Sequence, residues 1–273
     1  MVQRLNQNDP NFDNDFQSML NAKREVSEDV DAIVRDIIET VRSHGDQAVI
    51  DYTLKFDRTD LSNSGLAISP TEIDEALKAC DAETLEALEL AASRIRSHHE
   101  RQKPKDDRYE DAIGVELGSR WTALQSVGLY VPGGTASYPS SVLMNAIPAK
   151  VAGVDRVVMV VPTPDGEINP LVLAAAKLAG VDEIYRIGGA QAVAALAYGT
   201  ETIAPVAKIV GPGNAFVAAA KRRVFGTVGI DMIAGPSEVL IVADGNNNPD
   251  WVGTRLIGAS RTRHRCPIHA DDR

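Results

Sequence analysis

The chain has 273 residues, 44% of them hydrophobic and 24% charged, which is the composition of an ordinary globular protein of about two domains. Its formal net charge of −10 argues against binding to nucleic acid or to an anionic membrane surface. No apolar run approaches the ~20 residues of a transmembrane helix, and residues 1–7 lack the apolar core of a signal peptide. Cys80 and Cys266 form neither a disulfide framework nor a CxxC metal motif. We therefore predict a cytoplasmic α/β protein that acts on small molecules.

The first hundred residues have the periodicity of amphipathic helices. One apolar stripe with helical spacing consists of Val30, Ile33, Val34, Ile37, Ile38 and Val41. We expect Ser27 to cap this helix and Gly45 to end it. Residues 69–72 form a capping box that opens a second helix through Cys80, and residues 85–95 carry the stripe of a third.

From residue 125 the pattern changes to short apolar runs that alternate with alanine-rich helical stretches. The runs are Val127–Val131, Arg156–Val161, Glu183–Ile187, Ala207–Val210 and Glu238–Ala243. This alternation predicts βαβ units and a parallel sheet. The segment Lys150–Asp155 recurs as Lys177–Asp182, 27 residues later, and each copy is typical of a helix end, a glycine cap and the start of a strand. The repeat indicates one unit used twice in a doubly wound domain.

Three glycine-containing loops follow these runs, at the carboxyl ends of strands where open α/β sheets bind ligands. They contain Tyr130, Gln191 and Asn214. Glycines let the backbone approach a ligand, helix N-termini attract phosphate, and the two amides can bond ribose or nicotinamide groups. Neither a GxGxxG after the first strand nor a GxxxxGK[ST] loop is present. Each loop alone is more often a helix cap or tight turn, but three at one sheet edge favour a nucleotide-sized site.

The sequence evidence for two candidate nucleophiles is weaker than that for the three loops. Ser237 follows a Gly-Pro turn without the GxSxG motif, so acyl transfer is disfavoured, while substrate contact and a capping role both remain open. Cys80 lies on an amphipathic helix, where a cysteine more often belongs to the core than to a reaction.

The glycine loops, taken in order, resemble one family. The segments are GLYVPGG (128–134), GGAQA (188–192), GPGN (211–214) and AGPSE (234–238), and their order and spacing are similar to those of histidinol dehydrogenase over about residues 30–257. The resemblance implies a zinc-dependent cytoplasmic homodimer of histidine biosynthesis. Such an enzyme oxidises L-histidinol to L-histidine through histidinaldehyde and reduces one NAD⁺ in each of two steps.

The resemblance also implies a fold and a set of site residues. The fold is α/β with two Rossmann-like parallel-sheet domains of aldehyde-dehydrogenase-like architecture, the first interrupted by the second and incomplete in this chain. By motif, Tyr130, Gln191 and Asn214 correspond to NAD contacts and Ser237 to a substrate contact, whereas the Glu-His catalytic pair is expected beyond the truncation. The expected divisions are 1–126 (helical region and start of the first α/β domain), 127–236 (NAD-binding domain), 237–257 (return to the first domain) and 258–273 (tail).

The resemblance stops at about residue 258. Residues 251–273 contain five arginines but no lysine or glutamate. Codons permitted for residues 258–269, read one base later, encode Ala-Gln-Ala-Glu-His-Asp, which contains the Gln-Ala-Glu-His zinc motif of the family. We interpret the tail as out of frame, with Ala259 and Thr262 at two zinc-ligand positions, so that no intact metal site is expected. On this interpretation the spacing of His264, Cys266 and His269 has no metal-binding meaning.

Three hypotheses about activity remain open at this point. The first is a histidinol dehydrogenase, and the second is a catalytically inactive, truncated nucleotide-binding fragment of that family. A zinc-free α/β dehydrogenase is the third, but no catalytic base stands out in residues 1–257. For folding, we expect the sheet domain to hold its core and the stripe of residues 30–41 to lack a covering sheet, which would leave the chain unstable or prone to aggregate.

Overall fold

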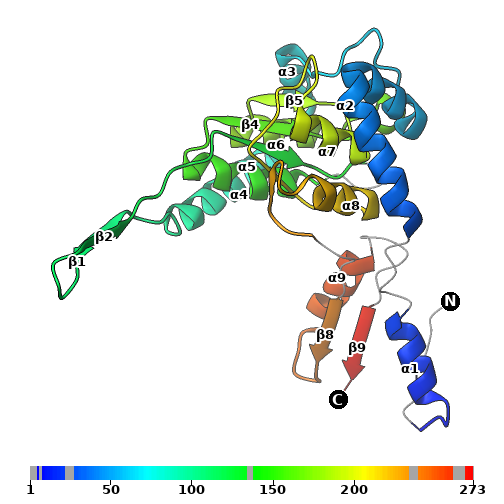
Figure 1. The fold of residues 1–273 in the computed structure, drawn as a ribbon. Helices are drawn as coiled ribbons and strands as arrows, with labels where there is room; N and C mark the ends of the chain where they lie inside the picture. Colours follow the sequence, from blue (N-terminus) through cyan, green and yellow to red (C-terminus); the bar gives the residue numbers. More distant parts are fainter. Residues whose placement is uncertain are drawn as a thin grey trace.

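A five-stranded parallel sheet forms the centre of the molecule (Figure 1). The computed structural model describes residue 5 and residues 8–21, 28–133, 138–233, 239–260 and 268–272. The strands lie in the order β5-β4-β3-β6-β7 and every neighbouring pair is parallel. They are β3 (Ser126–Tyr130), β4 (Arg156–Val160), β5 (Glu183–Tyr185), β6 (Lys208–Val210) and β7 (Gly229–Ile230). The prediction of an α/β fold with a parallel sheet is confirmed, and of these strands only β7 was not predicted.

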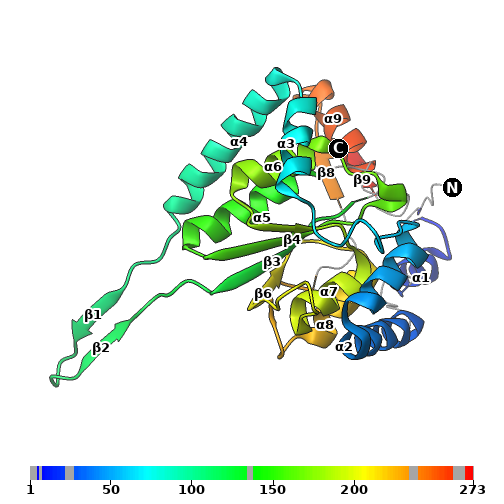
Figure 2. The same cartoon turned by 90° about the horizontal axis from the view of Figure 1, so that it is seen from above.

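Helices cover both faces of this sheet (Figure 2). This double cover explains why the central strands are apolar without alternation, since side chains on both faces are buried. One face carries α3 (Pro70–Ala79), α4 (Ala82–Glu100), α5 (Pro139–Ala152) and α6 (Pro170–Ala179). The other face carries α2 (Glu28–Asp57), α7 (Gly189–Tyr198) and α8 (Ala215–Val224). A short helix α1 (Phe12–Asn21) precedes them, and a 3₁₀ turn, η1 (Pro164–Gly166), follows β4.

The predicted repeat is confirmed at the ends of α5 and α6. Gly153 and Gly180 both adopt the left-handed conformation, with φ of 88° and 79°. The residue after each glycine donates its N–H to a carbonyl five residues back, Val154 to Ala149 and Val181 to Ala176, both at 3.0 Å. Each copy therefore ends a helix in the same way and turns the chain into the next strand.

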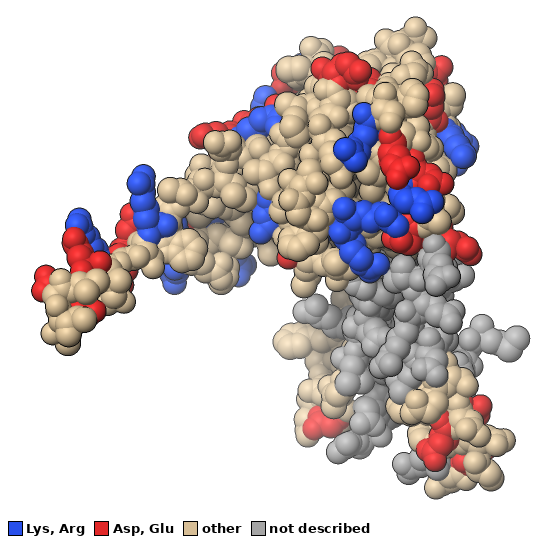
Figure 3. Space-filling view, in the orientation of Figure 1, with Lys and Arg blue, Asp and Glu red and all other residues tan. Residues whose placement is uncertain are grey.

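The helix α2 is covered, contrary to the expectation of an exposed N-terminal stripe. Val34, Ile37, Ile38 and Val41 are at most 6% exposed and belong to the same core as the sheet. The expectation was wrong because it assigned the cover of this helix to another sheet, whereas α7 and α8 provide it. Acidic and basic side chains mix over α2 and α8 (Figure 3), and an ion pair between Asp31 and Arg223 ties the two helices together.

Gly45 does not end α2. It has φ 53° and ψ −133°, which interrupts the helical backbone, but the helix continues to Asp57. Glu201 accepts the N–H of Asp46 at 2.7 Å beside this break. The predicted helix end at Gly45 is therefore wrong: φ is positive, as glycine permits, but ψ is not that of a left-handed cap, and the helix is kinked there instead. The capping box at Ser69 is confirmed in full, with reciprocal bonds to Glu72.

Two smaller sheets lie apart from the central one. β1 (Asp107–Glu110) and β2 (Glu116–Ser119) form an antiparallel ribbon that projects from the body (Figures 1 and 2), and all its residues are exposed. The ribbon was not predicted, because its strands show no clear alternation of apolar and polar residues. β8 (Val239–Ala243), predicted as a strand, pairs in parallel with β9 (Ile268–Asp272). Between them α9 (Pro249–Ser260) runs across residue 258, where the resemblance ends.

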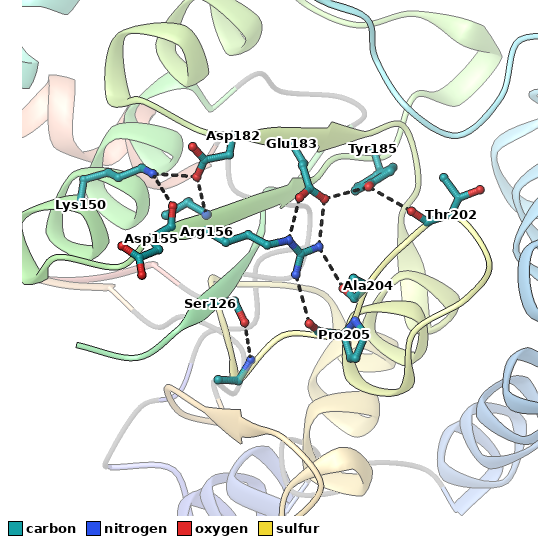
Figure 4. A network of polar contacts seen from close by, with 12 residues as sticks. Ser126, Lys150, Asp155, Arg156, Asp182, Glu183, Tyr185, Thr202, Ala204 and Pro205 are labelled. Atoms are coloured by element: carbon teal, nitrogen blue, oxygen red, sulfur yellow. Dashed lines mark hydrogen bonds and ion pairs between the residues drawn. The ribbon is translucent and has the colours of Figure 1, made fainter. Parts of the chain in front are cut away.

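A polar network joins the amino ends of β4 and β5 to the loop before β6 (Figure 4). The Arg156 guanidinium donates to both carboxylate oxygens of Glu183, at 2.7 and 2.9 Å, and to the carbonyls of Ala204 and Pro205. The Tyr185 hydroxyl donates to Glu183 at 2.9 Å. Burial, together with the hydrogen bond to Glu183 and its charge, raises the pKa of Tyr185 to about 12.

We expect Tyr185 to make the fold less stable at high pH. Its folded pKa lies above the ordinary value of 10.0, so the folded chain holds the phenolic proton more tightly than the unfolded chain does. The stability from this group is therefore full below pH 10.0 and is lost as the pH rises toward about 12. Urea unfolding at a series of alkaline pH values should show this loss in the unsubstituted chain and a smaller slope in Tyr185→Phe. Tyr109→Phe on the exposed ribbon is the control, and equal slopes in the two variants would contradict the assignment.

Candidate functional site

A cavity of about 310 Å³ lies at the carboxyl edge of the central sheet, and its volume is at the lower end for ligand-binding pockets. The three predicted loops after β3, β5 and β6 all contribute to it, together with the end of α2 and the loop after β4. The lining residues are Ile37, Phe56, Asp57, Tyr130, Pro132, Gly133, Pro162, Pro164, Gly189, Ala190, Gln191, Gly213, Asn214 and Phe216. Tyr130, Gln191 and Asn214 are thus brought together, as the edge argument predicted.

Tyr130 ends the central strand β3 and is 4% exposed. Its hydroxyl accepts the backbone N–H of Gly189 at 3.0 Å. The side chain therefore ties the loop after β3 to the start of α7, and it shapes the cavity besides lining it.

Gln191 lies in the first turn of α7 and is only 1% exposed. No described residue donates a hydrogen bond to its Oε1 atom, and an unpaired buried amide oxygen is costly. Gly189 has φ 66°, and a Cβ there would come within 2.6 Å of this oxygen. Only glycine therefore leaves room for the Gln191 side chain at this position, and Oε1 is an acceptor that suits a donor group.

Asn214 is the N-cap of α8, where its Oδ1 accepts the N–H of Val217 at 3.1 Å. The capping interpretation, kept open beside ligand binding, is therefore correct for this oxygen. The side chain also lines the cavity, so the two roles coexist in one residue.

A buried lysine fixes the loop before α8, and sequence reasoning missed it. Lys221 is 3% exposed, and its ammonium donates to the Gly211 carbonyl at 3.0 Å and pairs with the Asp231 carboxylate. Asp231 also accepts the N–H of Gly211 at 2.8 Å. Burial alone would raise the pKa of Asp231, but the hydrogen bonds from Lys221 and from two backbone N–H groups hold it below its ordinary value. A lysine within an alanine-rich helix was the available signal.

Asp57, the last residue of α2, is the other missed residue. It lines the cavity, and its buried Oδ2 has no hydrogen-bond partner within the part of the chain that the structure describes. Burial raises its pKa above the ordinary value, against the opposing charge of Arg58. No sequence signal pointed to it, since a carboxylate at a helix end ordinarily lies in solvent.

Cys80 is not among the residues that line the cavity. It follows α3 as its C-cap, half-buried, and its thiol donates to the Ala76 carbonyl at 3.2 Å. Burial and the nearby Asp81 raise the pKa of the Cys80 thiol. A raised pKa disfavours the reactive thiolate, which agrees with a structural cysteine.

The remaining predicted site residues are described only in part or not at all. Ser237 and Thr262 lie outside the described residues, and Ala259 lies on α9 with only its backbone described. Within the described part of the chain, no three His, Cys, Asp or Glu side chains are placed to hold a metal ion. These residues therefore do not fit a zinc centre, which needs three or four such ligands. No described helix is long and apolar enough to cross a bilayer.

Comparisons with known proteins agree on one family. The sequence model of the family "Histidinol dehydrogenase" matches residues 20–262. A histidinol dehydrogenase of Brucella abortus (strain 2308) is 71% identical over 257 residues, which is 94% of this chain and 60% of the relative. One of Rhizobium meliloti (strain 1021) is 68% identical, with 94% and 59% covered. The crystal structure of histidinol dehydrogenase from Elizabethkingia anophelis matches with a TM-score of 0.83 at 38% identity, over 91% of this chain and 57% of that one. The chain thus spans about 60% of the length of the curated relatives it matches.

Proposed function

Because this chain belongs to the histidinol dehydrogenase family, we propose that its protein oxidises L-histidinol to L-histidine through histidinaldehyde and uses NAD⁺ as hydride acceptor. We assign the dinucleotide-binding part of that activity to the cavity at the carboxyl edge of the sheet. The observation that carries this proposal is the convergence of Tyr130, Gln191 and Asn214, from three separate loops, on one cavity.

The chemistry of the cavity supports a dinucleotide. Gln191 has an acceptor atom that no described residue satisfies, and α7 and α8 both begin at the cavity, where helix N-termini favour phosphate. Phe56 and Phe216 line the same space and are 44% and 37% exposed, which provides apolar surface for flat rings. Bound NAD⁺ would supply the hydride acceptor, and the chain's own residues would bind and orient it.

We also propose a substrate contact, a location, a metal dependence and an oligomeric state for the whole enzyme. We assign Ser237 to substrate contact and the whole enzyme to a cytoplasmic, zinc-dependent homodimer, with no nucleic acid or membrane as partner. The described residues do not fit a zinc centre. We further propose that a polypeptide of this sequence lacks the activity, because Ala259 and Thr262 stand where the resemblance puts two zinc ligands.

Variants of Asn214 test the dinucleotide assignment. Asn214→Ala should weaken NAD⁺ binding by about 1 kcal/mol or more, because a ligand contact is lost, and should also lower stability by about 1 kcal/mol, because α8 loses its cap. Asn214→Ser keeps a capping oxygen, so it should weaken NAD⁺ binding without lowering the stability of the fold. Calorimetric titration with NAD⁺ and urea unfolding separate the two effects. Unchanged NAD⁺ affinity in both variants would refute the contact, and no NAD⁺ binding by the unsubstituted chain would refute the proposed function.

A further inference from the structure

Two residues that line the cavity each carry a buried hydrogen-bond acceptor that no described residue satisfies. They are Asp57 Oδ2, from the end of α2, and Gln191 Oε1, from the start of α7. A buried carboxylate oxygen without a donor is costly, and native proteins rarely keep one without a use. Because both atoms accept, a ligand that hydrogen-bonds to them would bring donors, such as hydroxyl or amide groups.

Asp57 is held in its position by a set of bonds between the end of α2 and the loop after β4. Arg58 donates to both carboxylate oxygens of Asp165, at 2.6 and 2.5 Å. Thr59 donates its hydroxyl to the Thr163 carbonyl at 2.7 Å and accepts the N–H of Gly166 at 2.9 Å. These bonds on the two residues after Asp57 keep its carboxylate beside the strand end.

The position of this carboxylate in the sheet suggests its partner. β4 neighbours the central strand β3, on the side away from the later strands β6 and β7. In doubly wound dinucleotide-binding folds, an acidic residue at the end of this second strand accepts the ribose hydroxyls. The loop after β4 carries Asp165, which is engaged by Arg58, and the exposed Glu167, and neither lines the cavity. Asp57 therefore provides a carboxylate at this end of β4 from a different part of the chain.

We propose that Asp57 accepts the adenosine ribose hydroxyls of the dinucleotide and so selects NAD⁺ over NADP⁺. The inference rests on the proposed function and deepens it, since it names the residue that sets cofactor choice. A 2′-phosphate in place of the hydroxyl would bring negative charge against the carboxylate and remove the donor, so the 2′-phosphorylated cofactor is excluded. Asp57 acts here in cofactor binding and takes no part in hydride transfer.

The test compares three ligands and two variants of the full chain. The unsubstituted chain should bind NAD⁺ more tightly than 2′-deoxy-NAD⁺ and NADP⁺ in calorimetric titrations. Asp57→Asn should weaken NAD⁺ binding about 10- to 100-fold, the range for hydrogen bonds to a charged group, and should reduce the preference over NADP⁺ at least about tenfold. Asp51→Asn is the matched control, because Asp51 is exposed on the same helix and bonds only Gln47 in the described structure.

The outcomes separate this inference from the proposed function. The proposed role of Asp57 is wrong if the chain binds NAD⁺ and 2′-deoxy-NAD⁺ equally well, or if Asp57→Asn leaves the NAD⁺/NADP⁺ preference unchanged. Neither result contradicts the proposal that the cavity binds NAD⁺. If the unsubstituted chain binds no NAD⁺, both proposals are wrong. The comparison of NAD⁺ with its 2′-deoxy form needs no variant, so it decides the question even if Asp57→Asn fails to fold.

Discussion

A purified polypeptide of this sequence is expected to bind NAD⁺ but to form no NADH from L-histidinol. The resemblance to histidinol dehydrogenase puts a Gln and a His zinc ligand at positions 259 and 262, which hold Ala259 and Thr262. A methyl group cannot coordinate zinc, and a neutral threonine hydroxyl is not among its usual ligands. Loss of proton-transfer groups alone lowers a rate about 10²- to 10⁴-fold, and loss of a metal that holds the substrate adds to this.

The assay is NADH absorbance with histidinol and added zinc. The Brucella abortus relative, 71% identical in the matched region, is the positive control in the same assay. Sequencing the coding DNA for residues 252–273 tests the explanation, because a frame shift predicts that a single-base correction encodes Gln-Ala-Glu-His. Zinc-dependent NADH production by the uncorrected polypeptide would refute both the inactivity and the interpretation of the tail.

The parts of the site that could be predicted from the sequence depend on local signals. Tyr130, Gln191 and Asn214 each stand in a glycine loop after an apolar run, and parallel strands bring such loops to one edge. The capping box at Ser69 and the repeated ends at Gly153 and Gly180 are also set by neighbours in sequence. In each case a few adjacent residues determine the backbone.

The parts that were missed depend on contacts between distant segments. Asp57 reaches the cavity because α2 packs on α7 and α8 and its end is bonded to the loop after β4, and the periodicity of α2 shows an apolar face without showing what covers it. The pairing of Lys221 with Asp231 joins a helix to the strand edge that follows it, and β7 is too short for a hydrophobic pattern. The roles of Ser237 and of residues 258–273 stay predictions.

Lys221→Ala should be the most destabilising single substitution near the cavity. It removes one partner of an ion pair whose lysine side chain is 4% exposed, and it leaves the Asp231 carboxylate and the Gly211 carbonyl without that donor. Breaking a buried pair costs about 3–5 kcal/mol, and we expect the lower end because Asp231 keeps 31% of its side chain exposed. The Gly211 loop, which leads into Gly213 and Asn214 of the cavity, should lose its fixed geometry, so NAD⁺ affinity should fall as well.

Urea unfolding of a small set of variants checks this expectation. Arg222→Ala, an exposed neighbour on α8, is the control for charge and helix content and should cost little. Adding Asp231→Asn to Lys221→Ala should cost less than the two single changes together, because the unpaired charge is removed as well. The folded pKa of Asp231 lies below 3.8, so its contribution is present above that pH and is lost as the pH falls through the folded pKa. A Lys221→Ala variant as stable as Arg222→Ala would show that the pair does not hold the loop. In that case the geometry of Asn214 would have to come from its capping bond to Val217 alone.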